Sequence, residues 1–591
     1  MSDYKKTCEL FRSLKAERDK YTPVWKDISR YVGISVDPDY LRNYGKKAVV
    51  QMDEYVDDPT ASISVNQFGD YLSGVMWGEE AVTLMPSSYV LDVAEVDEVA
   101  PWYRFASSRV LYHMNHEDAG FITGLRPYAY DQVSFGTSGM GVFRNEGFMD
   151  GRDSNAVSYM NYGIDSVVID EGKSGSVEVI FIPHHWRVSR IISEFAMKGG
   201  EMDKAAFERL PKAVRDAWRK SNFNEIFTVV YGVFPSDMYL SSSKKGKAGA
   251  RYKGVWFFDN PPTDGFLREE YYRHRPAAIC RQINVRGEVY GRSYGGLLLS
   301  TIRSVNYMMA QTIEILEKMG NPALGVFSNA VFGDMVLDSS PKGLTVFNQT
   351  LMGSGAPAFP LHDVGDPTGI ISFIIPYLNE KITSAFKVDA LLDFNSGRDM
   401  TATESLHRYT IRGASVSGIL SQQKNEFIVP VIKRTVGILE DVGELGINAR
   451  TEMGAARLLS GSGKEDRIIP EAVLDVMESG RPWYDVKMNT ELERLSSTEK
   501  IQNLLTVINT IGSVAMLYPQ IVEAVDWYKL VSEINQLVDK NSAIMLSPNE
   551  FREKVAQAAQ QQAMMMGLQA GESAAKIRKE TAVADKMDAG G

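Results

Sequence analysis

Residues 287–322, with the sequence GEVYGRSYGGLLLSTIRSVNYMMAQTIEILEKMGNP, decide the fold. A short turn rich in Gly and Tyr leads into apolar residues at spacings of four, three, four, four and three, which is the pattern of one helix face. These residues are Leu298, Ile302, Val305, Met309, Ile313 and Leu316. The pattern predicts a helix that ends at Gly320-Asn-Pro322, because proline cannot continue it. About 25 residues at ~1.5 Å each would give a rod of roughly 37 Å.

A second helix is expected after a segment rich in Gly, Ser and Pro. That segment runs to residue 365 and contains short apolar runs at 330–337 and 344–347. Asp366 and Pro367 then supply an N-cap and a first-turn proline for a helix that reaches about Val388. We expect the two helices to form an antiparallel pair joined through a compact insertion.

A third, longer helix is expected after the loop at 391–400, which shows no periodicity. The helix opens with a capping box, Thr401-Ala-Thr403-Glu404, and extends to about Glu444. Pro430 removes an internal hydrogen bond from this helix. We therefore expect a kink at Pro430.

The remainder of the chain is expected to be helical with β-structure in its first half. Between about 155 and 290, short β-branched and aromatic runs predict an antiparallel sheet carried on a helical body. The basic, Gly-rich excursion at 241–251 contains no aromatic residue, which favours a solvated hairpin tip over a nucleic-acid contact. A helix from 128 is expected to pass into the Gly-rich stretch at 136–141. Further helices are predicted at residues 1–30, 65–76, 102–114, 496–519 and from 547 onward.

Composition excludes several classes of protein. Hydrophobic residues make up 44% of the 591 residues and charged residues 24%, the balance of a globular chain with several structural regions. No long apolar run occurs and the N-terminus is charged throughout, so neither a membrane span nor a secretory signal is expected. Cys8 and Cys280 are too few for a disulfide framework, and we expect buried free thiols.

The net charge of −11 argues against a protein that wraps nucleic acid tightly, since that binding depends on neutralising phosphates. It is compatible with a protein that lets DNA slide. A mildly acidic channel lining repels phosphates over about one Debye length, roughly 8 Å at physiological salt, whereas a basic lining would hold them.

Two motifs that suggest ligand binding are incomplete. Gly461-Ser-Gly-Lys464 has Leu458 in place of the first Gly of a phosphate-binding loop and Glu465 in place of its Ser or Thr. The adjacent His184 and His185 would point to opposite faces of a strand, so they could not clamp one metal ion. We expect no catalytic residue and no cofactor.

One histidine pair leaves an alternative open. His113 and His116, beside Glu117, could share one face of a helix and bind a metal ion. The sequence places no third ligand near them, which favours surface residues near a helix end. A metal-dependent hydrolase that uses these residues remains the less favoured alternative.

Several motifs, taken in order, resemble the head-to-tail connecting (portal) proteins of short-tailed, podovirus-type double-stranded DNA phages. The resemblance spans nearly the whole chain, and each motif is weak when taken alone. The motifs are an N-terminal helix with Arg18, Tyr21 and Trp25; the turn Tyr290-Gly291-Arg292-Ser293; the helix end Glu317–Pro322; the Thr401-Ala-Thr403-Glu404 helix; and Leu517-Tyr-Pro519 followed by Ser547-Pro548.

The resemblance implies a mainly helical α+β portal fold, with wing, stem, clip and crown regions that assemble as a ring around an axial channel. The implied regions are a wing body at 1–293, stem helices at 294–320 and 367–388, a clip at 321–366, a channel loop at 389–400, a long kinked wing helix at 401–445, a return segment at 446–489, a helical crown at 490–570 and a mobile tail at 571–591.

The resemblance also implies roles for individual residues. In a closed ring, one face of each stem helix must pack against a neighbouring subunit. The implied stem contacts are Leu298, Ile302, Val305, Met309, Ile313, Leu316, Ile371, Leu378 and Ile382. The implied channel-loop residues, which would contact passing phosphates without reading bases, are Asp393, Asn395, Gly397, Arg398 and Asp399.

The partners implied are further copies of the chain in a ring of twelve, double-stranded DNA that passes without sequence specificity, the packaging motor (terminase), a tail adaptor, capsid and scaffolding proteins, and internal core proteins, with no membrane. Another virion ring component, such as a tail adaptor, is an alternative, although adaptors are generally much shorter. A helical interaction protein of the cytosol is a further alternative, but it gives no reason for a structured insertion between two capped helices.

Overall fold

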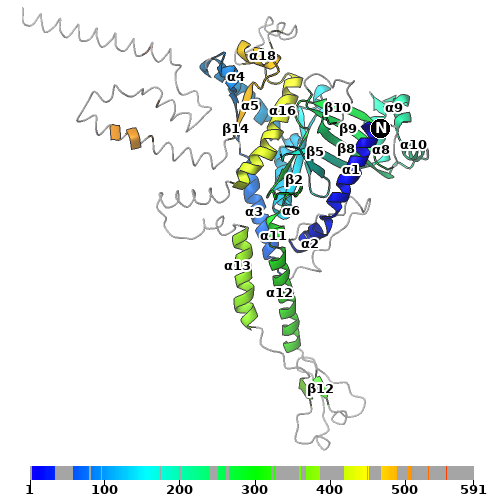
Figure 1. Ribbon diagram of the computed structural model, residues 1–591, viewed down its shortest axis with the longest axis vertical. Coiled ribbons are helices and arrows are strands. Elements are labelled where there is room, and N and C mark those ends of the chain that lie inside the picture. Colours follow the sequence, from blue (N-terminus) through cyan, green and yellow to red (C-terminus); the bar gives the residue numbers. More distant parts are fainter. Residues whose placement is uncertain are drawn as a thin grey trace, which may run out of the picture. The chain divides into compact units, whose positions relative to one another are not determined.

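The computed structural model describes most of the chain (Figure 1). The described residues are 3–32, 58–78, 81–94, 96–173, 175–198, 201–238, 250–260, 265–320, 324–326, 358–360, 368–386, 418–448, 450, 467–488, 504, 506–508, 510–511, 530 and 554. The chain forms two compact units. The first is made of Met1–Val82 and Phe105–Ile469, and the second of Thr83–Arg104 and Pro470–Gly591.

Two helices, α1 (Asp3–Asp19) and α2 (Thr22–Val32), form the predicted helical N-terminus. Pro23 lies in the first turn of α2, where its missing N–H leaves no intrahelical bond unmade, so it marks the start of a new helix. The apolar face of α1 packs on a β-sheet. The residues of this core include Tyr4, Phe11, Leu14, Val168, Phe181, Val230, Val255 and Phe257.

That sheet is antiparallel, as predicted, and has five strands in the order β10-β9-β8-β5-β4. The strands are β4 (Val168–Glu171), β5 (Val177–Arg187), β8 (Ile226–Pro235), β9 (Tyr252–Phe258) and β10 (Arg268–Tyr272). Between β5 and β8 the chain forms α8 (Val188–Phe195), β6 (Met197–Lys198), β7 (Glu201–Met202), α9 (Lys204–Arg209) and α10 (Lys212–Arg219).

A second sheet corrects the expectation of one sheet that starts near residue 155. The Gly-rich stretch lies in its central strand, β2, and is buried. Glycine suits this strand because the rings of Phe143 and Tyr162 occupy the space that a side chain at Gly141 would need. The strands, in spatial order, are β11 (Ala277–Arg281), β2 (Thr137–Arg144) and β3 (Val157–Tyr162).

Helix α6 (Phe121–Phe135) contacts strands β2 and β3 of this second sheet. α3 (Thr60–Met76) and α5 (Val96–Asn115) confirm the helices predicted at 65–76 and 102–114, and α3 packs against α6. A short 3-10 helix, η2 (Glu117–Ala119), follows α5, and a short α-helix, α7 (Glu146–Met149), follows β2. In the part of the chain that the structure describes, no helix is long and apolar enough to span a bilayer.

The helix predicted from residues 287–322 begins with a short turn, α11 (Tyr294–Leu297), and continues as α12 (Leu299–Gly320). It lies beside α13 (Ile375–Ala385), which confirms the predicted pairing (Figure 1). In the insertion between them, β12 (Leu324–Val326) pairs antiparallel with β13 (Ala358–Pro360). The predicted apolar runs at 330–337 and 344–347 lie outside the described residues.

A π-helix precedes a proline in two helices. η3 (Ile370–Ile374) leads into α13 with its Pro376, and η5 (Lys424–Ile428) leads into α16 (Val429–Val442) with its Pro430. A π-turn holds one residue more than an α-turn, which relieves the clash between a proline ring and the carbonyl of the preceding turn. Pro430 thus follows a local change of helix type, and the kink itself stays a prediction.

The second unit is built from segments that are far apart in the sequence. β1 (Val82–Pro86) pairs with β14 (Tyr484–Met488). The rings of Trp102 and Trp483 lie 5.2 Å apart, and the Tyr103 hydroxyl donates a hydrogen bond to the Trp483 carbonyl. The helices α4 (Ser88–Leu91) and α18 (Glu471–Glu478) contact each other in the same unit.

Candidate functional site

The turn before α12 depends on two glycines that approach each other closely. Gly136 has a positive φ of 81°, and a Cβ atom there would lie 2.5 Å from the carbonyl carbon of Arg292. A Cβ at Gly291 would lie 2.8 Å from the Cβ of Arg281. Ser293 then caps α11, because its Oγ accepts a 2.8 Å hydrogen bond from the Gly296 N–H. The turn sequence therefore fixes where the long helix starts.

The structure brings together two motifs that the sequence analysis treated separately. The Tyr290 ring lies 5.4 Å from the Tyr21 ring and 5.2 Å from the Trp25 ring. The Arg18 guanidinium lies over Trp25, and its NηH2 group donates a 2.7 Å hydrogen bond to the Ile164 carbonyl. Tyr290 is buried, and its hydroxyl accepts a hydrogen bond from the Ile169 N–H. The N-terminal helices are thereby fixed to the base of α12.

The predicted stem contacts divide into two groups. Ile302, Val305 and Ile382 are each 1% exposed within the chain itself, so they have almost no surface left for a neighbouring subunit. The face that these three residues occupy packs inside the subunit, and their role as contacts between subunits stays a prediction. The other predicted contacts keep surface, with Ile313, Leu316 and Ile371 exposed and Leu298, Met309 and Leu378 partly exposed.

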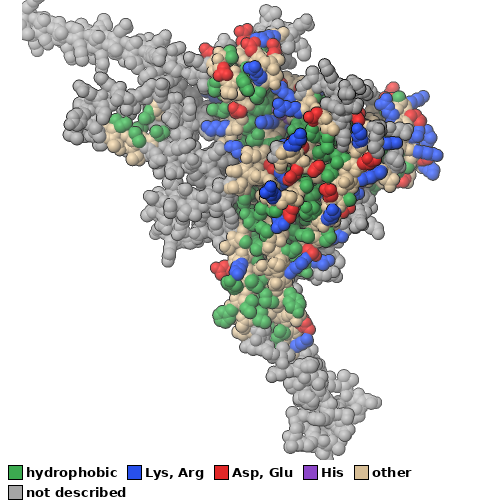
Figure 2. All heavy atoms as spheres, viewed as in Figure 1, with side chains coloured by type: hydrophobic (Ala, Val, Ile, Leu, Met, Phe, Trp, Pro, Cys, Tyr) green, Lys and Arg blue, Asp and Glu red, His purple; other side chains and the backbone are tan. Residues whose placement is uncertain are grey.

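Further exposed apolar side chains extend this surface. Phe373 is 75% exposed, Tyr307 67% and Tyr377 54%, which is unusual for large aromatic residues. Figure 2 shows hydrophobic side chains gathered over the α12 and α13 helices. We call this the stem surface, and its exposed residues are Leu297, Tyr307, Ile313, Leu316, Met319, Ile371, Phe373, Ile374 and Tyr377.

A buried aspartate joins both stem helices to α3. The Asp58 N–H donates a 3.1 Å hydrogen bond to the Asn306 Oδ1 on α12. Its carboxylate accepts one from the Asn379 Nδ2 on α13, at 2.8 Å, and another from the Thr60 N–H at the start of α3. Asp58 is 4% exposed. This cluster could not be predicted from the sequence, because single polar residues carry no periodic signal.

A buried arginine holds the π-helix η5 to the first unit's sheets. Arg281 forms ion pairs with Glu171 on β4 and with Glu426 on η5, and its side chain is 2% exposed. Beside it, the Phe427 ring stacks on Tyr128 at 3.8 Å, and the Tyr128 hydroxyl bonds to Gln423. These contacts fix the helix at the point where its hydrogen-bond pattern changes.

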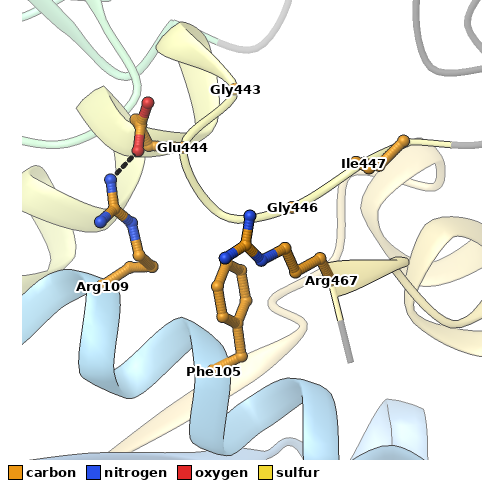
Figure 3. Close-up of a pocket in the computed structure, with 7 residues that line it drawn as sticks. All are labelled: Phe105, Arg109, Gly443, Glu444, Gly446, Ile447 and Arg467. Atoms are coloured by element: carbon orange, nitrogen blue, oxygen red, sulfur yellow. Dashed lines mark hydrogen bonds and ion pairs between the residues drawn. The ribbon is translucent and has the colours of Figure 1, made fainter. Parts of the chain in front are cut away.

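A pocket opens between α5 and the segment that follows α16 (Figure 3). Its volume is about 380 Å³. Arg109 on α5 forms an ion pair with Glu444, and the Arg467 guanidinium lies 5.9 Å from the centre of the Phe105 ring. The residues that line the pocket are Phe105, Arg109, Gly443, Glu444, Gly446, Ile447 and Arg467.

His113 contacts Arg109 and Glu444, which line this pocket, and it is fully buried, so the expectation of a surface residue is wrong for it. Its Nδ1 lies 3.0 Å from the Asn155 Oδ1, and its Nε2 lies 3.7 Å from the Glu444 Oε2. The hydrogen bond with His113, followed by the bond and charge of Arg109, lowers the pKa of Glu444 to about 2.

The described residues do not place a third ligand near the histidine pair. The His116 side chain, which is 19% exposed, bonds to the Ser154 hydroxyl at 2.8 Å, whereas His113 faces Asn155. Within the described ranges, no group of three His, Cys, Asp or Glu side chains could hold a metal ion. His184 and His185, both on β5, contact Trp256 and Thr228 respectively.

Some predicted residues lie outside the described part of the chain. They are the channel-loop residues Asp393, Asn395, Gly397, Arg398 and Asp399, the capping-box residues Thr401, Thr403 and Glu404, and the Gly461–Lys464 segment. Their predicted roles stay predictions.

Residues 5–448 match the family described as "Bacteriophage head to tail connecting protein". Among solved structures, a chain from "Virion of native gene transfer agent (GTA) particle" is 11% identical, with a TM-score of 0.28, over 72% of this chain and 91% of that chain. A chain from "Neck of empty GTA particle computed with C6 symmetry" is 11% identical, with a TM-score of 0.29, over 65% of this chain and 76% of that chain. No curated protein matches the sequence.

Proposed function

The chain belongs to the bacteriophage head to tail connecting protein family, a family of structural virion proteins and not of enzymes, and from this premise we propose that it is a portal subunit. Twelve copies form a ring at one capsid vertex. Double-stranded DNA passes through the ring during packaging and ejection, and the tail attaches to it.

The observation that carries this proposal is the stem surface. An isolated soluble chain seldom exposes large apolar side chains together, and a contiguous apolar surface marks a site of protein contact. Here the exposed residues lie on two paired helices, including Phe373 and Tyr307. In a ring, each subunit presents one surface to the next and a different surface to the previous one, so both helices can be covered.

The charge of the chain supports passage of DNA without tight binding. Each subunit carries a net charge of −11, so the ring as a whole repels phosphates except where basic side chains cluster. The loop at 389–400 narrows the channel and contacts phosphates through Arg398, with Asp393 and Asp399 limiting the attraction. Sequence specificity for the genome lies in the packaging motor.

The remaining proposed partners follow from a position at the head-to-tail junction. The insertion between α12 and α13, whose ends meet in the β12–β13 pair, faces the terminase motor and afterwards the tail adaptor. The wing contacts capsid and scaffolding proteins, and the crown lies inside the capsid beside internal core proteins. We propose a short-tailed phage as the source of this arrangement.

Electron microscopy of the purified protein, with native mass measurement, tests the ring. Closed rings of about twelve subunits with a hole wide enough for a roughly 20 Å duplex are expected. A monomer or dimer under every salt condition would contradict the proposal.

A matched pair of variants tests the stem surface itself. Phe373→Ser removes the most exposed aromatic residue of that surface, and Val93→Ser removes an apolar side chain that is 63% exposed elsewhere. Phe373→Ser is expected to shift the mass distribution from rings to monomers, while Val93→Ser leaves it unchanged. Equal ring yields for both variants would show that the stem surface is not the subunit contact.

A further inference from the structure

The pocket shown in Figure 3 contains an unbalanced positive charge. Two arginines and one glutamate line it. Arg109 and Glu444 form an ion pair and neutralise each other, and Glu444 stays ionised because its partners hold its pKa at about 2. Among the described residues, no remaining acidic one lines the pocket to neutralise the positive charge of Arg467.

Arg467 has no acidic partner in the described part of the chain, and its backbone is fixed. The Ile447 N–H donates a 2.7 Å hydrogen bond to the Arg467 carbonyl, and the Ile469 N–H donates one to the Ile447 carbonyl at 3.1 Å. The guanidinium lies over the Phe105 ring, which attracts a cation but takes none of its in-plane donors. The N–H groups of Arg467 are therefore available to a ligand.

Arg109 adds further donors on the opposite side of the pocket. Its contacts with Glu444 and His113 both use the same terminal nitrogen, Nη2. A guanidinium carries five N–H donors, so the Nε and Nη1 groups of Arg109 keep theirs. Gly443 and Gly446, which also line the pocket, contribute no side chains to fill it.

We propose that this pocket binds a phosphate group between Arg467 and Arg109. A guanidinium matches two phosphate oxygens with parallel N–H donors, so Arg467 supplies both the uncompensated charge and a pair of donors, and Arg109 supplies further donors. The volume of about 380 Å³ accommodates a phosphate with its hydration waters. The phosphate comes either from solution or from the backbone of DNA. This inference does not depend on ring formation or on the channel assignments.

Titration of the full-length protein with inorganic phosphate at low ionic strength, followed by calorimetry, tests the site. Arg467→Gln is expected to weaken phosphate binding at least tenfold. Arg467→Lys keeps the positive charge but loses the paired N–H donors of the guanidinium, and it should have a smaller effect. The matched control is Arg481→Gln, because Arg481 also lies over an aromatic ring, that of Tyr89, without being part of the pocket. The Arg481→Gln protein should bind phosphate as tightly as the unaltered protein does.

A second arm uses duplex DNA of random sequence and measures how the affinity depends on salt. If DNA is the source of the phosphate, Arg467→Gln lowers the slope of log affinity against log salt by about 1. A change in the inorganic phosphate arm alone identifies a free anion as the ligand. The proposal is overturned if Arg467→Gln and Arg481→Gln behave alike in both arms, or if the unaltered protein binds neither ligand.

Stability serves as the check on these variants. Arg467 is exposed, so its replacement should leave the unfolding midpoint unchanged, and a loss of binding can then be assigned to the pocket.

Discussion

Asn379 on α13 donates a 2.8 Å hydrogen bond to the carboxylate of Asp58, the residue that also bonds to Asn306 on α12. One buried residue, through its backbone N–H and its carboxylate, thus joins the two stem helices to each other and to α3.

Replacement of Asp58 by Ala should loosen this junction. The change removes the acceptor of both the Asn379 amide and the Thr60 N–H, and we expect a loss of about 2 kcal/mol in the free energy of unfolding. Amide hydrogen exchange should become faster in α13. Asp70→Ala, at an exposed ion pair with Arg126, is the control and should change stability by less than about 1 kcal/mol. Equal effects of the two changes would show that the Asp58 contacts do not stabilise the stem.

Three glycine replacements separate backbone strain from crowding. Gly151→Ala meets no atom within 4 Å and has a φ of +68°, so it should cost about 1 kcal/mol from backbone strain alone. Gly136→Ala adds a clash with Arg292 to the same strain, and we expect about 3 kcal/mol or more from denaturant unfolding. Gly291→Ala has the clash without a positive φ and should fall between them. A Gly136→Ala protein as stable as Gly151→Ala would mean that the turn before α12 can relax.

Glu426→Gln tests the buried attachment of the π-helix η5. The change leaves Arg281 with one acidic partner in a site where its side chain is 2% exposed. We expect a loss of about 3 kcal/mol, because a buried charge is left partly uncompensated. Glu314→Gln breaks a pair with Lys318 in which both side chains are at least half exposed, and it should have almost no effect. Urea unfolding measures the loss of stability in both variants. Equal losses would show that the buried Arg281–Glu426 pair stabilises the fold no more than the exposed Lys318–Glu314 pair does.

The buried carboxyl of Asp131 should make stability depend on pH. Burial, and next the nearby Asp165 carboxylate, raise the pKa of Asp131 well above its usual range. A pKa that is higher in the folded than in the unfolded state stabilises the fold at low pH, and this contribution is lost as pH rises through the folded value. Asp131→Asn keeps the shape and removes the titration.

The measurement for Asp131 is the unfolding midpoint as a function of pH. The unaltered protein should lose stability as pH rises above about 4, the ordinary pKa of an Asp carboxyl, towards the raised folded value, and Asp131→Asn should flatten that decline. Asp70→Asn, at an exposed carboxylate, should leave the curve as it is. Parallel curves for the unaltered protein and Asp131→Asn would mean that ionising Asp131 in the folded protein costs no stability.

Features that depend only on residues close together in the chain could be predicted from the sequence. The stripe from Leu298 to Leu316 located α12, because helix periodicity is a local property. The same stripe could not show that Ile302 and Val305 pack inside the subunit, since periodicity identifies an apolar face and not its partner. The Gly-rich stretch at 136–141 looked like the end of a helix, although neighbouring strands make it a buried strand.

Contacts between distant residues could not be predicted. Arg281 and Glu426 are 145 residues apart, and Asp58 and Asn379 are 321 apart. Each is an ordinary polar residue in its own segment, and its role depends on the tertiary fold. The pocket has the same origin, because Phe105 and Arg467 come from distant parts of the chain. For His113, a position near a helix end without a third metal ligand favoured exposure, whereas packing against Asn155 buries it.

The arrangement of the second unit has a consequence for synthesis on the ribosome. Tyr103 bonds to Trp483, which is 380 residues later in the chain. At roughly 5–20 residues per second, translation needs roughly 20–80 s to supply that partner. During this interval Trp102 and Tyr103 have been synthesised without the ring that covers them. The nascent chain therefore carries an unprotected aromatic segment for most of its synthesis.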